Sequence, residues 1–119
     1  MSNAQTCEFI PGGDSNVFIR EMYFEKAGDQ IVTHQHNFDH VTYVPQGALR
    51  IEKTDGINGP VIKSVEVRAG RRNWILIRAG VCHRVTALED DSVGHCTFAH
   101  RTPQGEVTQT YDGWEAAHV

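Results

Sequence analysis

Four histidines carry the clearest chemical signal in this chain. His34, His36 and His40 lie within seven residues of one another, and His83 follows in a separate segment. Residues two apart on a β-strand point to the same side, so we expect His34 and His36 to present two imidazoles together. His40 opens the apolar run that ends at Val44 and can bring a third ring from the start of the next strand. Imidazole is the commonest metal-binding side chain, and this spacing predicts a metal site.

The elements that must position these rings are short strands separated by glycine and turn residues. No window longer than one turn shows a helical period, and many short strands at regular spacing are typical of an antiparallel sandwich or barrel. On strand parity, Thr42 and Val44 share the inward face of His40, and Leu49 and Ile51 line the interior. The expected strands span residues 17–24, 31–36, 40–44, 48–53, 61–67, 73–77, 82–87, 93–100 and 107–111.

The whole chain is predicted to be one all-β domain. Its 119 residues suffice for a single core. We expect an N-terminal segment at residues 1–16, a barrel at residues 17–111 and a tail at residues 112–119. Residues 1–4 resemble the remnant of an expression tag, which carries no fold information.

Composition excludes several classes of function. The net charge of −4 with mixed signs gives no basic surface for nucleic acid. No apolar run approaches the roughly 20 residues of a membrane helix, and no signal-peptide pattern opens the chain, so we expect a cytoplasmic protein. The three cysteines, Cys7, Cys82 and Cys96, show no Cys-x-x-Cys spacing, which argues against a disulfide framework and a thiolate zinc site.

The histidine spacing resembles the first motif of the cupin family. That motif is a glycine, five residues, His-x-His, three or four residues, a glutamate, six residues and a glycine. Its fixed points here are Gly28, His34, His36, position 40 and Gly47, with His40 in place of the glutamate. The stretch Arg78-Ala-Gly80-Val-Cys-His83 resembles the second motif, with arginine in place of its proline, and the resemblance covers roughly residues 17–100.

The resemblance implies a double-stranded β-helix, the jelly-roll barrel of cupins, with His34, His36 and His83 as metal ligands. Some small cupins carry histidine at the glutamate position, so His40 is expected to be the fourth ligand. Four neutral ligands leave the charge of a divalent ion uncompensated, and the site should attract an enolate, carboxylate or alkoxide. A six-coordinate ion would keep two positions open for substrate, water or dioxygen.

Other residues are weaker candidates. Arg20, Arg50 and Arg78 are possible anchors for an anionic substrate, and His100 or Cys96 is a possible donor near the metal. Trp74 and Phe98 could flank a pocket, although an aromatic residue in a barrel more often belongs to the core.

Three classes of function remain open. The first is a metal-dependent oxygenase acting on a small anionic or enolisable substrate, which needs a redox-active ion such as Fe or Mn. The second is a non-redox isomerase, lyase or cyclase, for which Zn, Ni or Cu would also serve. The third is a non-catalytic module that binds a small molecule. The fold alone does not choose among them.

Two further expectations concern assembly and pH. Residues 17–24 are apolar on both alternating faces, which predicts a homodimer in which the second face meets another chain. Every histidine ligand must be neutral to bind an ion, so metal binding should weaken as the pH falls.

Overall fold

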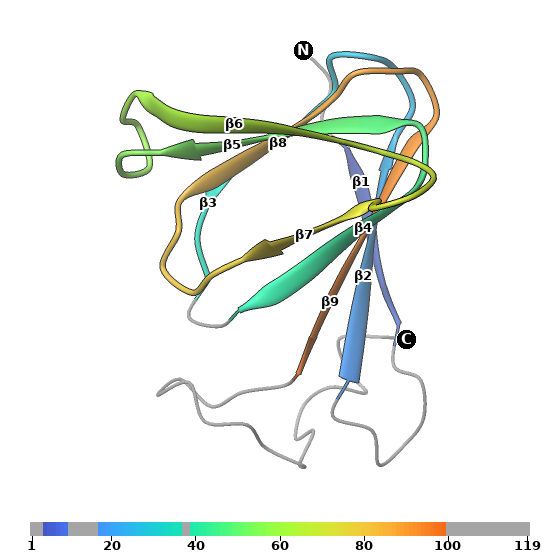
Figure 1. The fold of residues 1–119 in the computed structure, drawn as a ribbon, viewed down its shortest axis with the longest axis horizontal. Coiled ribbons are helices and arrows are strands. Elements are labelled where there is room, and N and C mark those ends of the chain that lie inside the picture. Colours follow the sequence, from blue (N-terminus) through green and yellow to red (C-terminus); the bar gives the residue numbers. More distant parts are fainter. Residues whose placement is uncertain (1–3, 10–16, 37–38, 100–119) are drawn as a thin grey trace.

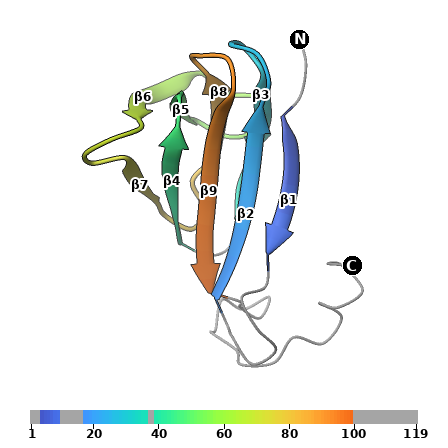
Figure 2. The same ribbon diagram turned by 90° about the vertical axis from the view of Figure 1, so that its right-hand side faces the viewer.

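The computed structural model describes residues 4–9, 17–36 and 39–99, and this part of the chain contains nine strands and no helix. All strand pairs are antiparallel and form two sheets that face each other (Figures 1 and 2). The first sheet contains β1 (Gln5–Phe9), β2 (Val17–Phe24), β9 (Ser92–Ala99), β4 (His40–Gln46) and β7 (Trp74–Ile77), in that order. The second contains β3 (Gln30–His34), β8 (His83–Ala87), β5 (Ala48–Thr54) and β6 (Val61–Arg68), also in order. The all-β prediction is confirmed.

The core lies between the two sheets. On the inner face of the second sheet, residues directly opposite in adjacent strands form two apolar rows, Ala87–Leu49–Val67 and Val85–Ile51–Val65. From the first sheet, Phe24 and Val44 are fully buried. Burying an aliphatic or aromatic side chain of this size contributes roughly 1.5–3 kcal/mol. These rows fix the register of the sheets and hence the position of the residues that follow them toward the barrel mouth.

Strand β4 shows the predicted alternation of inward and outward side chains. His40, Thr42 and Val44 are buried, whereas Tyr43 is exposed. The period of two therefore placed His40 on the inner face correctly. Trp74 on the neighbouring strand β7 differs from the expectation of a core aromatic, because its side chain lies on the outer face and is 56% exposed.

A tight turn at Gly47 joins β4 to β5. Its φ of 75° lies in the left-handed region that favours glycine. A Cβ atom at this position would also fall 2.9 Å from the Cα of Ser92, which is closer than real Cβ contacts. Gly47 is therefore required both for its backbone conformation and for the close approach of β9.

Several element boundaries differ from those expected. Strand β1 lies within the segment predicted to precede the barrel, and it pairs with β2 along its whole length. Ala4, assigned to a tag remnant, donates its backbone N–H to the carbonyl of Gln30 at 3.2 Å and packs against the core. Strand β3 ends at His34 instead of continuing to His36. The expected strand at residues 107–111 and the tail at residues 112–119 lie outside the described residues.

No helix in the described residues has the length and apolar character that crossing a membrane requires.

Candidate metal centre

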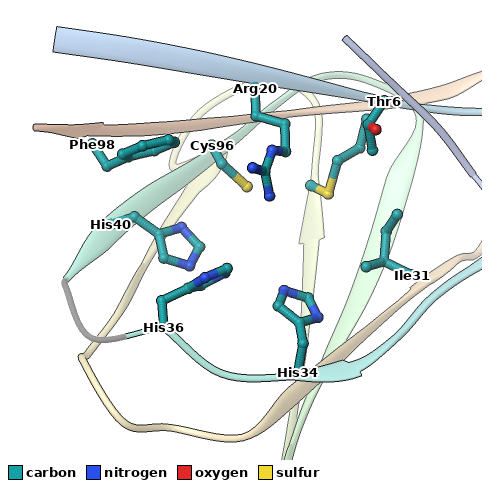
Figure 3. Close-up of a pocket in the computed structure, with 9 residues that line it drawn as sticks. Thr6, Arg20, Ile31, His34, His36, His40, Cys96 and Phe98 are labelled. Carbon is teal, nitrogen blue, oxygen red and sulfur yellow. The ribbon is translucent and has the colours of Figure 1, made fainter. Parts of the chain in front are cut away.

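The four predicted histidines lie together at one end of the barrel. His34 is the last residue of β3, His36 lies two residues beyond it, and His40 and His83 open β4 and β8. The ring centroids of His34 and His83 are 4.3 Å apart, and those of His36 and His40 are 5.1 Å apart. Ligand atoms of His34, His36 and His83 lie within 4.8 Å of one another. Figure 3 shows His34, His36 and His40 directed toward a common space.

Backbone hydrogen bonds orient two of these rings. The Nδ1 atoms of His34 and His83 lie 2.8 Å from the carbonyl oxygens of Val32 and Val81. Because a carbonyl oxygen only accepts, Nδ1–H must be the donor in each neutral ring. That tautomer leaves the lone pair on Nε2, the arrangement that a metal-binding histidine adopts when a carbonyl holds its other nitrogen.

His36 is positioned by contacts between two loops. Its backbone carbonyl accepts a hydrogen bond from the N–H of Gly80 at 2.7 Å. Nearby, the carboxylate of Asp39 accepts the N–H of Ala79, also at 2.7 Å. These bonds attach the loop that carries His36 to the turn that precedes His83, and they replace the strand pairing expected for residues 35 and 36.

His40 is buried, with 4% of its surface exposed. Its Nδ1 lies 3.5 Å from the hydroxyl of Thr42, which in turn lies 3.4 Å from the thiol sulfur of Cys96. These distances are at the long limit of hydrogen bonding, so the chain of groups orients the ring only weakly.

Burial keeps the cluster neutral. Desolvation, followed by repulsion from the other histidines, lowers the pKa of His36 to about 4 and that of His40 to about 3. Burial also lowers the pKa of His83. The positive charge of Arg20 acts in the same direction on His36 and His40. At neutral pH these three rings are therefore unprotonated, which is the form that a metal ion requires.

A small pocket adjoins the rings and encloses about 40 Å³, room for about three water molecules. Arg20 of β2 and Cys96 of β9, in the same sheet as His40 and across from His34, point into it, and Phe98 forms one side (Figure 3). The remaining lining residues are Thr6, Met22, Ile31, His34, His36 and His40. Desolvation raises the pKa of the Cys96 thiol, so this group is protonated at neutral pH.

The structure separates the three arginine candidates. Arg20 lines the histidine pocket, whereas Arg50 lies on the outer face of the second sheet, 3.9 Å from Glu52. Arg78 is exposed and lines a different pocket between β6 and β7. His95 lies on the outer face, and its Nε2 is 2.9 Å from a carboxylate oxygen of Glu21. His100 lies outside the described residues.

Sequence reasoning missed two contributions to this end of the barrel. Thr6 lines the histidine pocket from β1, a strand without an alternating apolar pattern. Lys53 and Lys63 lie in one row with His83 across the second sheet. Strand parity could have placed Lys53 on the face of Leu49 and Ile51, but only the register of β6 brings Lys63 beside it.

Comparison with solved structures identifies the fold of this chain. No family model matches the sequence, and no curated protein matches it. Among solved structures, KdgF from Halomonas sp. is similar with a TM-score of 0.64 and 22% identity, over 85% of this chain and 82% of that one. A cupin-2 domain protein from Shewanella frigidimarina gives a TM-score of 0.58 and 19% identity, over 78% and 79% of the two chains.

A larger protein shares the same architecture. Oxalate oxidase in complex with the substrate analogue glycolate gives a TM-score of 0.68 and 19% identity, over 86% of this chain and 53% of that one. These similarities agree with the two facing sheets and with the motif spacing around the histidines. By these similarities, this chain has the jelly-roll fold of the cupin structures.

Proposed function

We propose that His34, His36, His40 and His83 bind one divalent transition-metal ion. The observation that carries this proposal is the convergence of His34, His36 and His83, whose ligand atoms lie within 4.8 Å of one another, with the ring centroid of His40 5.1 Å from that of His36. Backbone carbonyls fix the Nε2 lone pairs of His34 and His83. The donor set fits such an ion, because three of the rings are kept neutral by burial and imidazole is a good ligand for Fe, Zn, Ni and Cu.

The same site favours an anionic ligand beside the metal. None of the residues that line the histidine pocket is a carboxylate, so nothing in the lining offsets the charge of a divalent ion. Arg20 adds a permanent positive charge on the opposite wall. A carboxylate or enolate would therefore be held between the ion and the guanidinium, and the small volume of the pocket limits such a ligand to a few non-hydrogen atoms.

We infer that the activity is that of an oxygenase. Proton abstraction needs a base that titrates near neutral pH. Apart from the imidazoles, the polar groups of the lining are the Thr6 hydroxyl, the Arg20 guanidinium and the protonated Cys96 thiol, none of which is a base near neutral pH. A bound Fe or Mn ion would supply reactivity toward dioxygen. In this proposal Arg20 orients the substrate, while Met22, Ile31 and Phe98 exclude water from it.

The alternative is a metal-dependent lyase or isomerase. The observation that favours it is Cys96, whose neutral thiol lies in the pocket and could donate a proton to a carbanion. The two classes differ in a direct observable, since only the oxygenase consumes dioxygen.

Metal analysis of untagged protein tests the first part of the proposal. We expect close to one equivalent of Fe or Mn per chain, measured by mass spectrometry of the elements. His95→Ala removes an imidazole from the outer face and is the matched control for His83→Ala. Full metal occupancy in His83→Ala would contradict the four-histidine site.

An oxygen electrode tests the second part. The protein is screened against small hydroxy acids, oxo acids and 1,3-dicarbonyl compounds, each paired with its neutral ester or ether where one exists. We expect oxygen uptake with an acid, loss of that uptake in Arg20→Gln and partial retention in Arg20→Lys. Turnover without oxygen uptake, abolished by Cys96→Ala, would instead favour the lyase or isomerase.

A further inference from the structure

A second and larger pocket lies between the edges of the two sheets. It encloses about 310 Å³, within the range of roughly 300–1,000 Å³ that small-molecule sites occupy. Strands β6 and β7, the outermost strands of their sheets, lie on either side of it (Figure 1). It shares no lining residue with the pocket beside the histidines, although His83 of the histidine cluster lines it. The proposed metal function assigns no role to this space.

The residues that line this pocket fall into an apolar group and a mainly cationic group. Most of the lining is apolar, contributed by Ile51, Val65, Ile75, Leu76, Ile77 and Val81. The polar lining consists of His83 and three cations, Lys53, Lys63 and Arg78. None of the lining residues is a carboxylate. Such an interior fits a ligand with an apolar body and a negative charge.

The lysines belong to one row across the second sheet. His34 of β3 lies opposite His83 of β8, His83 lies opposite Lys53 of β5, and Lys53 lies opposite Lys63 of β6. Residues opposite one another in adjacent strands point to the same face. The row next to the two apolar rows of the core therefore carries a nitrogen-bearing side chain on all four strands.

The pairing of Lys53 with Lys63 is unfavourable by itself, because like charges directly opposite each other destabilise a sheet. The nearest carboxylates on the same strands do not relieve it. Glu52 faces the other side, where it accepts a hydrogen bond from Arg84 at 3.0 Å. Glu66 also faces that side, 3.3 Å from Arg68. An anion placed between the two ammonium groups would offset their repulsion.

We propose that this pocket binds a small organic anion whose charged group lies between Lys53 and Lys63 and whose apolar body packs on Ile51, Val65 and Ile75. Arg78, on the loop after β7, supplies a third positive charge from the other wall. The inference does not depend on the metal proposed for the histidines, since the cations and the apolar wall are present in either case.

Octanoate is the probe, because it combines a carboxylate with an unbranched apolar chain. The full-length protein is titrated with octanoate at low ionic strength, and binding is followed by backbone amide shifts in a nitrogen-15 correlation spectrum. We expect saturable shifts in β5, β6 and β7. Octylammonium should give none of this binding, because it presents the same chain with the opposite charge.

Variants of the lysines make the test specific. Lys53→Gln and Lys63→Gln should each weaken octanoate binding about fivefold, the upper end for an exposed ion pair, and added salt should abolish the difference. Lys26→Gln, in the exposed turn between β2 and β3, removes the same charge away from the pocket and should leave the affinity unchanged. Lys63→Glu should allow octylammonium to bind.

Addition of EDTA separates this site from the proposed metal centre. Affinity within about twofold with and without EDTA supports an independent site. Loss of octanoate binding in EDTA would overturn the proposal, because it would place the carboxylate on the metal. Shifts centred on β2 and β9, equal binding of octylammonium, unchanged affinity in both lysine variants or the absence of saturable shifts would each overturn it as well.

Discussion

At the scale of single residues, the four histidines are not equivalent. His34 and His83 are oriented by carbonyl acceptors, whereas His40 is buried and its Nδ1 lies 3.5 Å from the Thr42 hydroxyl. His83 also joins the histidine cluster to the larger pocket, since its ring lies 4.3 Å from that of His34 and it lines the larger pocket. Its loss should therefore remove a proposed metal ligand and also change the lining of the larger pocket.

His83→Ala should lower metal affinity by at least about a hundredfold, because even the loss of an outer partner of a metal ligand costs up to that factor. Competition with a chromophoric chelator measures the affinity. His95→Ala, whose partner is Glu21 on the outer face, should bind the metal as the parent protein does. Similar affinities for the two variants would exclude His83 from the site.

The metal-free protein should lose stability in acid. The unfolded chain protonates histidine near pH 6.5, but the folded chain keeps His36 and His40 neutral down to about pH 4 and pH 3. The unfolded state therefore binds more protons in this window, and the free energy of unfolding falls as the pH drops from about 6.5 toward these values.

Urea unfolding in EDTA at pH 7, 6, 5 and 4.5 checks this slope. His40→Gln removes one of the two groups with strongly lowered pKa values, so its unfolding free energy should vary less with pH than that of the parent. Parallel curves for the two proteins would contradict the assignment of the slope to His40.

The same pKa values change the expectation for metal binding. At a free histidine, protons begin to displace a bound metal ion when the pH falls toward the histidine pKa of about 6.5. In this chain burial has already displaced the protons from His36 and His40, so proton competition at these two ligands begins only well below that pH.

At the scale of elements, the lysine row and the Gly47 turn lead to opposite expectations for stability. The first is a like-charge pair that the fold tolerates at the edge of a pocket. The second is a close contact between the turn at Gly47 and Ser92 of β9 that tolerates no side chain.

Lys63→Gln should stabilise the ligand-free protein by about 0.5 kcal/mol, because it removes the cross-strand repulsion with Lys53. Urea unfolding at low ionic strength measures the gain, which 1 M salt should remove. Lys26→Gln changes the net charge by the same amount, so it shows how much of the gain in stability comes from net charge alone. An equal gain in both variants would mean that the pairing contributes nothing.

Gly47→Ala should destabilise the protein by about 2–4 kcal/mol, since it combines a left-handed backbone with a clash against Ser92. Gly56→Ala is the matched control. Its φ of 80° is similar, but no atom lies within 4 Å of the added Cβ, so only the backbone strain of about 1 kcal/mol remains. Thermal unfolding of both variants distinguishes the two contributions.

At the scale of the whole molecule, the outer face of the first sheet is apolar in part. Tyr43 lies opposite Trp74 and Val41 lies opposite Leu76, and Tyr43, Trp74 and Leu76 are each more than 40% exposed. On β2, Phe18, Met22 and Phe24 are buried, and the other face carries the half-buried Ile19 and Tyr23. The homodimer predicted from the β2 sequence stays a prediction. The exposed residues of β4 and β7 add apolar surface to the same face of the first sheet.

We propose that two chains associate through this face. Size-exclusion chromatography with light scattering should return twice the 13.3 kDa of one chain. Leu76→Glu should shift the protein toward the monomer, since a charge buried in an apolar contact is costly. Ile62→Glu, on the exposed outer side of β6, is the control and should leave the dimer intact. A parent protein that runs as a monomer would refute the proposal.

The sequence by itself determined the fold class and the inward face of β4, and its resemblance to the cupin motifs pointed to the four histidines. The inward face follows from a local rule, because a strand period of two places His40 with Thr42 and Val44 whatever lies opposite them. The motif spacing likewise carried the cupin resemblance that the solved structures support.

Only the tertiary structure decided which arginine faces the histidines and which lysines face each other. Parity with Leu49 and Ile51 turns Arg50 outward, but the β2 sequence is apolar on both faces, so it could not show whether Arg20 faces the histidines. The position of His36 likewise could not be predicted from the local sequence. Hydrogen bonds from Gly80 and Ala79 hold its loop after β3 has ended, and such contacts depend on residues 40 or more positions away in the chain.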